Sequence, residues 1–262
     1  MHEVAIEIGG NPIRLRSTDS KFLSTLERRY AGFWRPSENT GALLNIELRA
    51  PQTTRDEDVQ VSVQTGEWHI RRGDFYAVWN HRQRTGTVLQ QASPYALDSA
   101  LRIIHSLLLT DEDGFLIHAA SAIRGGEAFF FAGPSGAGKT TLTRMAPGDA
   151  TVLSDEISYI RCDGDGYHAC GTPFSGELGK PGQNTRAPLA GWFILAQGDE
   201  NRLELFSSRA EALRLLMQNI LFFAREPEIT ARVFNAACRF VAQMPGQRFV
   251  FRREPAAWEL VK

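Results

Sequence analysis

The chain has 262 residues, of which 43% are hydrophobic and 23% are charged, and its formal net charge is −1. This composition is ordinary for a soluble globular protein that buries a sizeable core, and it gives no reason to expect binding to nucleic acid or to an anionic membrane. The N-terminal sequence MHEVAIEIGG lacks the basic and apolar regions of a secretory signal, and no apolar run reaches the roughly 18 residues of a membrane helix. Three cysteines without a C-x-x-C pair indicate free thiols. We therefore predict a cytoplasmic protein.

The first third of the chain is rich in predicted strands. The alternating segments VAIEI and IRLR, separated by the turn signal GGNP, predict a hairpin. Residues 19–33 have apolar positions at helical spacing, with Thr18 or Asp19 as the N-cap. Further strands are expected at LLNIEL, VQVSV, WHIRR, FYAVWN and TVLQQA, with an exposed loop at PQTTRDED.

The character of the sequence changes near Pro94, where PYALDSALRIIHSLLL predicts a helix. We predict a domain boundary just before this helix, giving a small α+β domain over residues 1–93 and a second domain over residues 94–262. Strands are then expected at FLIHAASAI, AFFFA, TVL, YHAC, GWFILA, RLELF and RFVFRR. The segment GTPFSGELGKPGQNTRAPL predicts a long loop. Two amphipathic helices are expected at about 208–225 and 227–243, and a short helical tail closes the chain.

The segment FFFAGPSGAGKTTLTRM places an apolar strand directly before a glycine-rich turn and a lysine. It fits the pattern G-x-x-x-x-G-K-[ST], in which glycines let successive backbone N–H groups converge on phosphate oxygens. Lys139 is expected near the β- and γ-phosphates, and the Thr140 hydroxyl on Mg²⁺. We therefore predict that ATP and Mg²⁺ bind here. The predicted binding residues are Gly133, Pro134, Ser135, Gly136, Ala137, Gly138, Lys139, Thr140 and Thr141.

An acidic pair follows the next short strand. Asp155 and Glu156 follow the predicted strand TVL after one serine, and Asp155 lies fifteen residues beyond Thr140. One carboxylate can hold Mg²⁺ and the other can accept a proton from an attacking hydroxyl. We predict Thr140 and Asp155 as the metal ligands, and Asp155 or Glu156 as the group that orients or deprotonates the acceptor. On its own, the pair is more typical of a hairpin turn than of a metal site.

Three segments together resemble one enzyme family. HAAS, GPSGAGKT and SDE, in that order, are similar to the catalytic domain of HPr serine kinase/phosphorylase, which shares a fold group with phosphoenolpyruvate carboxykinase. The resemblance covers about residues 114–204 and is closest to HPr-kinase-like proteins of bacterial peptide-modification clusters. It implies an α/β phosphate-loop domain behind the small α+β domain. It also implies roles for two residues that sequence pattern alone does not assign: His118 near the reacting phosphate, and Arg186 stabilising transferred charge.

The expected function is Mg-assisted phosphoryl transfer from ATP to a hydroxyl. The resemblance implies that this hydroxyl belongs to a serine of a peptide or small protein. The predicted catalytic residues are His118, Lys139, Asp155, Glu156 and Arg186. Residues 1–93 are expected to bind the acceptor, and a homo-oligomer is compatible with the sequence. Two alternatives stay open: a small-molecule phosphotransferase or carboxykinase-like enzyme, and a nucleotide-binding regulator in which Glu156 replaces an essential base.

Overall fold

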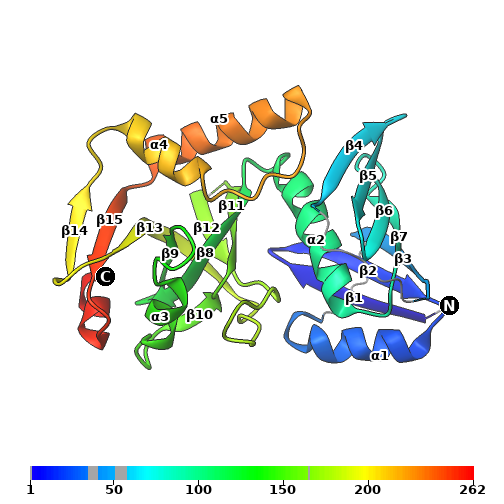
Figure 1. Cartoon of the computed structure of the whole chain (residues 1–262), viewed down its shortest axis with the longest axis horizontal. Helices are drawn as coiled ribbons and strands as arrows, with labels where there is room; N and C mark the ends of the chain where they lie inside the picture. Colours follow the sequence, from blue (N-terminus) through cyan, green and yellow to red (C-terminus); the bar gives the residue numbers. More distant parts are fainter. Residues whose placement is uncertain (1, 35–40, 51–57, 165) are drawn as a thin grey trace. The chain divides into compact units, whose positions relative to one another are not determined.

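The computed structural model describes residues 2–34, 41–50, 58–164 and 166–262, and these fall into two compact units (Figure 1). Unit 1 comprises Met1–Leu108 and Phe222–Thr230, and unit 2 comprises Leu109–Leu221 and Ala231–Lys262. The loop predicted at PQTTRDED lies almost entirely outside the described residues. The division of the chain into domains at residues 93 and 94 stays a prediction.

Unit 1 contains a seven-stranded mixed sheet in the order β1-β2-β3-β7-β6-β5-β4. The β2–β3 and β3–β7 pairs are parallel and the others are antiparallel. The predicted hairpin and the five further strands are confirmed. The strands are β1 (His2–Ile8), β2 (Asn11–Ser17), β3 (Ala42–Leu48), β4 (Gln60–Gln64), β5 (Glu67–Arg72), β6 (Phe75–Asn80) and β7 (Thr85–Gln90).

The helix predicted over 19–33 is α1 (Ser20–Arg29) followed by the 3-10 helix η1 (Ala31–Phe33). Asp19 is the N-cap, since its side chain accepts a hydrogen bond from the Phe22 N–H at 2.8 Å. Helix α2 (Pro94–Leu109) carries the buried Asp98, which accepts hydrogen bonds from Tyr30 Oη at 2.6 Å and from Arg29 at 2.5 Å. These bonds join α2 to α1 within unit 1.

Unit 2 contains an eight-stranded mixed sheet whose path runs β10-β8-β11-β12-β13-β15-β14. Strand β9 lies off this path and pairs with both β8 and β13, so β8, β11, β12, β13 and β9 form a closed ring of pairings. The strands are β8 (Phe115–Arg124), β9 (Glu127–Ala132), β10 (Thr151–Ser154), β11 (Ile157–Asp163), β12 (Gly166–Cys170), β13 (Arg186–Gln197), β14 (Arg202–Leu205) and β15 (Gly246–Phe251).

The predicted fold class, an α/β domain of the HPr kinase and phosphoenolpyruvate carboxykinase type, is wrong. The structure is strand-rich, with two mixed sheets. The reason lies in the connections: β8 and β9 are joined by a tight turn at Gly125 and Gly126, and β11 and β12 pair as an antiparallel hairpin. Strands joined this way need no crossover helix, whereas an α/β sheet depends on such helices.

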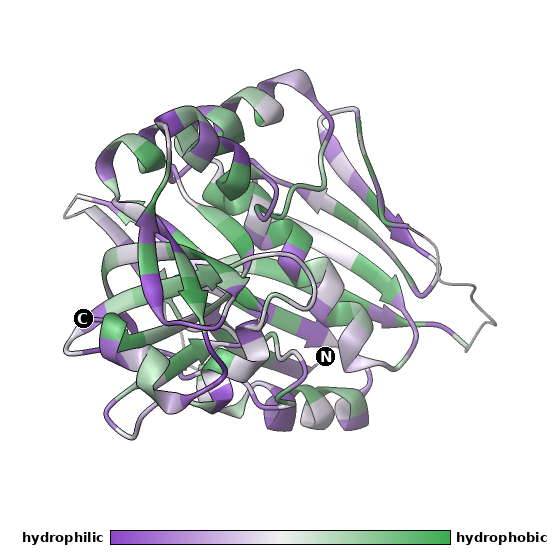
Figure 2. Ribbon diagram, turned by 60° about the vertical axis from the view of Figure 1, so that its left-hand side comes forward, coloured by the Kyte–Doolittle hydropathy of each residue, from purple (hydrophilic) through white to green (hydrophobic). Residues whose placement is uncertain are grey.

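Strand β9 is buried on both faces, which explains its sequence AFFFA. On one face Phe131 packs against Phe193 and Trp258, with ring centroids 5.5 Å apart in each pair. On the other face Phe130 stacks on Trp192 and on Phe240. In Figure 2 the apolar residues run along the strands, whereas many of the connections are polar. The end of β9, where the glycine-rich turn begins, is therefore held in a rigid aromatic core.

The helices of the C-terminal half differ from expectation at one point. They are α3 (Lys139–Arg144), α4 (Arg209–Met217), α5 (Pro227–Gln243) and the 3-10 helix η2 (Pro255–Leu260). The helix predicted to reach residue 225 ends at Met217, because the chain leaves it to pair with β8: Ile220 forms a bridge with Ile117, and the Leu221 N–H bonds the Leu116 carbonyl at 2.8 Å. Among the described residues no helix is long and apolar enough to cross a membrane.

Candidate functional site

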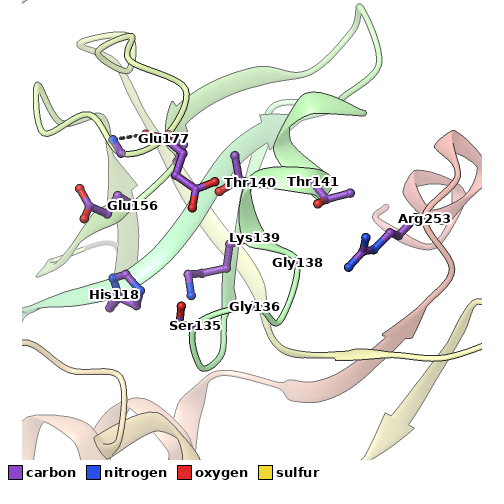
Figure 3. A pocket seen from close by; sticks show the side chains of 12 residues that line it. His118, Ser135, Gly136, Gly138, Lys139, Thr140, Thr141, Glu156, Glu177 and Arg253 are labelled. Atoms are coloured by element: carbon purple, nitrogen blue, oxygen red, sulfur yellow. Dashed lines mark hydrogen bonds between the residues drawn. The ribbon is translucent and has the colours of Figure 1, made fainter.

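A cavity of about 350 Å³ lies in unit 2, over the turn that follows β9 (Figure 3). Four of the five predicted catalytic residues meet in it, although they come from separate parts of the chain. The lining residues are His118, Ser135, Gly136, Gly138, Lys139, Thr140, Thr141, Asp155, Glu156, Gly176, Glu177 and Arg253.

The glycine-rich turn has the backbone that its sequence requires. Gly133, Gly136 and Gly138 have φ values of 153°, 81° and 108°, a region that favours glycine. Of the predicted binding set, Gly133, Pro134 and Ala137 do not line the cavity. Ala137 instead belongs to the aromatic core behind the turn. The turn therefore has an inner side that anchors it and an outer side that faces the cavity.

Gly138 makes the closest approach between the turn and the core. A Cβ atom there would lie 2.6 Å from Cζ of Phe251 on β15. We expect Gly138→Ala to destabilise the protein by about 1–3 kcal/mol, because it adds a strained backbone to this contact. Urea unfolding measures the change.

Gly148→Ala is the matched control, since a Cβ at Gly148 meets nothing within 4 Å. A Gly138→Ala protein as stable as the Gly148→Ala protein would contradict this account of the turn.

Lys139 is 8% exposed and folds back over the turn. Its ammonium group donates hydrogen bonds to the carbonyls of Gly133 at 2.7 Å and Pro134 at 3.2 Å. Burial lowers the pKa of Lys139, and the nearby carboxylates of Glu156 and Glu177 oppose that shift. The amine is thus a buried positive charge at the cavity wall, in electrostatic contact with two acidic side chains.

Asp155 holds a loop in place. It is 5% exposed, and its two carboxylate oxygens accept hydrogen bonds from the backbone N–H groups of Gly176 and Leu178, both at 2.9 Å. The N–H groups of Glu156 and Ile157 bond the Ser154 hydroxyl, which fixes the bend between β10 and β11. The acidic pair follows strand β10 as predicted.

Glu177 lies between Gly176 and Leu178, so the two hydrogen bonds to Asp155 hold its backbone in place. Figure 3 shows the Glu177 carboxylate turned toward Thr140, whereas Glu156 lies farther to the left, above His118. Glu177 is not among the residues predicted from the sequence, although it is a carboxylate within the glycine-rich segment GTPFSGELG. Within the described ranges no three His, Cys, Asp or Glu residues are grouped so that they could hold a metal ion. A cation at Thr140 would therefore need oxygens from a bound phosphate as well.

His118 lies on β8, opposite Ile157 of β11, and its side chain lines the cavity. Its backbone N–H bonds the Asn219 carbonyl at 2.8 Å. The Asn219 side chain accepts a hydrogen bond from the Gly133 N–H at 3.1 Å and donates one to the Leu215 carbonyl at 2.8 Å. Asn219 thus joins β8, the glycine-rich turn and the end of α4. No sequence signal pointed to it, because it lies inside a helical pattern.

Two arginines were not placed correctly from the sequence: Arg186 was predicted in the site, and Arg253 was not. The structure does not bring Arg186 into the cavity: its side chain is 59% exposed and pairs with Asp163 at 3.0 Å. Its predicted role stays a prediction. Arg253, which the sequence presents only as one of several RR pairs, does line the cavity.

Comparison with known proteins corrects the resemblance drawn from the sequence. No curated protein matches the chain. Residues 90–259 match the model of a family described as SynChlorMet cassette protein ScmC, and no HPr kinase family matches. The assignment to HPr serine kinase/phosphorylase is therefore wrong: HAAS, GPSGAGKT and SDE are short segments, and they do not carry a family assignment on their own. Because the match covers well over half of the chain, the protein belongs to the ScmC family.

Proposed function

We propose that the cavity of unit 2 binds Mg-ATP and transfers its terminal phosphoryl group to a hydroxyl of an acceptor. The observation that carries this proposal is the meeting of Lys139, Thr140, Glu156 and His118 around one cavity beside a glycine-rich turn. A lysine, a hydroxyl, a carboxylate and converging backbone N–H groups are the parts that phosphoryl transfer needs, since it depends mainly on positioning and charge stabilisation.

The residues present fit a nucleotide with its metal ion. Gly136 has nothing within 4 Å of where a Cβ would stand, so that side of the turn is open for a phosphate to approach the backbone. The Thr140 hydroxyl and the Glu177 carboxylate would hold Mg²⁺, which would shield the charge of the phosphates. Asp155, predicted as a metal ligand, supports this site by positioning the loop that carries Glu177.

The chain's own residues have distinct tasks in the proposed step. The ammonium of Lys139 moves from the carbonyls of its own turn to the β- and γ-phosphates. The acceptor oxygen attacks the γ-phosphorus, the bond from that phosphorus to the bridging oxygen breaks, and ADP leaves. The carboxylate of Glu156 takes the proton of the acceptor hydroxyl, and His118 orients that hydroxyl.

The acceptor is most simply sought among the products encoded with this protein. The family description names a cassette protein, so the other products of that cassette are the first acceptors to test. We propose a serine of a peptide or small protein among them. In this proposal the strand-rich residues 1–93 help to bind the acceptor, because an exposed sheet edge can take up an extended peptide.

A transfer assay tests the proposal. The full-length protein is incubated with Mg²⁺ and ATP labelled at the γ-phosphate, together with each of the other cassette products. We expect label on one of them, as a phosphoserine located by mass spectrometry. Absence of label on every product, together with absence of ATP binding, would contradict the proposal.

One observation favours a second candidate, a nucleotide-binding regulator without transfer. Both carboxylate oxygens of Asp155 accept hydrogen bonds from loop N–H groups, so this carboxylate has a structural role. The same assay separates the two candidates, since a regulator binds Mg-ATP but labels no product.

A further inference from the structure

Arg253 forms the wall of the cavity that lies opposite the acidic residues. It lies two residues beyond the end of β15, and Figure 3 shows its guanidinium group turned toward Gly138 and Thr141. His118 and Glu156 lie on the other side of the turn in the same view. The cavity therefore has a positive end and a largely acidic end, with the glycine-rich turn between them.

Two contacts fix this end of β15 to the turn. Phe251 packs against Gly138 so closely that no Cβ would fit between them. Gln197, at the end of β13, donates a hydrogen bond to the Gly136 carbonyl at 2.7 Å and accepts one from Arg253 at 3.3 Å. The turn and Arg253 are thus held by the same neighbours, so the arginine has a defined place relative to any phosphate bound on the turn.

The adjacent Arg252 does not share this arrangement. It is absent from the cavity lining, its side chain is 66% exposed, and its guanidinium lies 3.8 Å from the Glu254 carboxylate. The two neighbouring arginines therefore differ in whether they reach the cavity. This makes Arg252 a matched control for Arg253.

The positions of the proposed base, Glu156, and of Arg253 set the direction of a bound nucleotide. The terminal phosphate must lie where the acceptor hydroxyl meets Glu156, at the acidic end. The phosphates next to the nucleoside then lie toward the other end, where a planar guanidinium can donate two parallel hydrogen bonds to phosphate oxygens.

We propose that Arg253 binds the phosphates nearest the nucleoside, α and β, of a nucleoside di- or triphosphate. The inference rests on the proposed function, because it assumes that a nucleotide occupies the cavity. Arg253 would contact only phosphates that ATP and ADP have in common. The transferred γ-phosphate would instead be bound by Lys139 and the residues of the acidic end.

Titration calorimetry with full-length protein tests this with Mg-ATP and Mg-ADP as the probes. We expect Arg253→Ala to raise Kd about tenfold for both nucleotides, as for the loss of a charge-assisted contact. Arg253→Lys should recover part of the affinity, and Arg252→Ala should bind both nucleotides like the wild type. Unfolding curves of the variants without nucleotide show that each is folded.

The outcomes separate the inference from the function on which it rests. Wild-type protein that binds neither nucleotide overturns both. If the wild type binds nucleotide and the Arg253→Ala and Arg252→Ala proteins have equal Kd values, the inference alone is overturned. A loss confined to ATP also overturns it, since Arg253 would then contact the γ-phosphate.

Discussion

Lys139→Ala is expected to raise the Kd for Mg-ATP by about tenfold to a hundredfold and to slow transfer by about a hundredfold to a thousandfold. The ammonium group is buried at the cavity wall, where it donates hydrogen bonds to two carbonyls of its own turn. A phosphate offers it a stronger, charged partner than those carbonyls do. Its loss therefore removes one of the main attractions between the cavity and a triphosphate.

Thermal unfolding with and without millimolar Mg-ATP measures the binding effect, because a ligand that binds only the native state raises Tm by mass action. Lys139→Met keeps most of the apolar stem and separates the charge from the packing. Lys180→Ala is the control, since Lys180 is an exposed lysine of the loop 171–185 and does not line the cavity. A Tm shift in the Lys139→Ala protein equal to that of the wild type would show that the lysine does not serve the nucleotide.

Local elements were largely predictable from the sequence because their signals are local. The hairpin turn GGNP, the Asp19 cap and the strand AFFFA each depend on residues within a few positions, and the structure has them where expected. Sheet topology was not predictable in this way. The parallel pairing of β9 with β13 joins segments about sixty residues apart, and no periodicity in either segment specifies the other as its partner.

The residues of the candidate site also fall into those that local motifs predict and those that only the tertiary structure brings together. The glycine-rich turn and the acidic pair are short motifs, so they were found, and the structure brings them to one cavity. Arg253 reaches that cavity through the pairing of β15 with β13, and Asn219 reaches the glycine-rich turn behind it through the early end of α4. Both causes are tertiary. Glu177 was predictable only in part. Its carboxylate could be noticed in the sequence, but the orientation of its loop depends on two hydrogen bonds to Asp155 that no sequence pattern predicts.

Asp155→Asn and Glu156→Gln should separate support from chemistry within the acidic pair. An asparagine at 155 keeps one acceptor oxygen and turns an NH₂ group toward the other loop N–H, so one of the two bonds to Gly176 and Leu178 is lost in a buried place. We expect this to destabilise the protein by about 1–3 kcal/mol and to release Glu177 from its position. Transfer should fall by about a hundredfold or more.

Glu156→Gln should leave the unfolding midpoint and the Kd for Mg-ATP near their wild-type values, yet slow transfer, because a glutamine amide cannot take the acceptor's proton. Urea unfolding, calorimetry and the labelled-ATP assay on the same preparations give the three readouts. Glu200→Gln, a neutralised exposed carboxylate that does not line the cavity, controls for the change in net charge. An Asp155→Asn protein with wild-type stability would refute the supporting role of Asp155. A Glu156→Gln protein with the wild-type transfer rate would remove Glu156 as the base and leave His118 as the group to test.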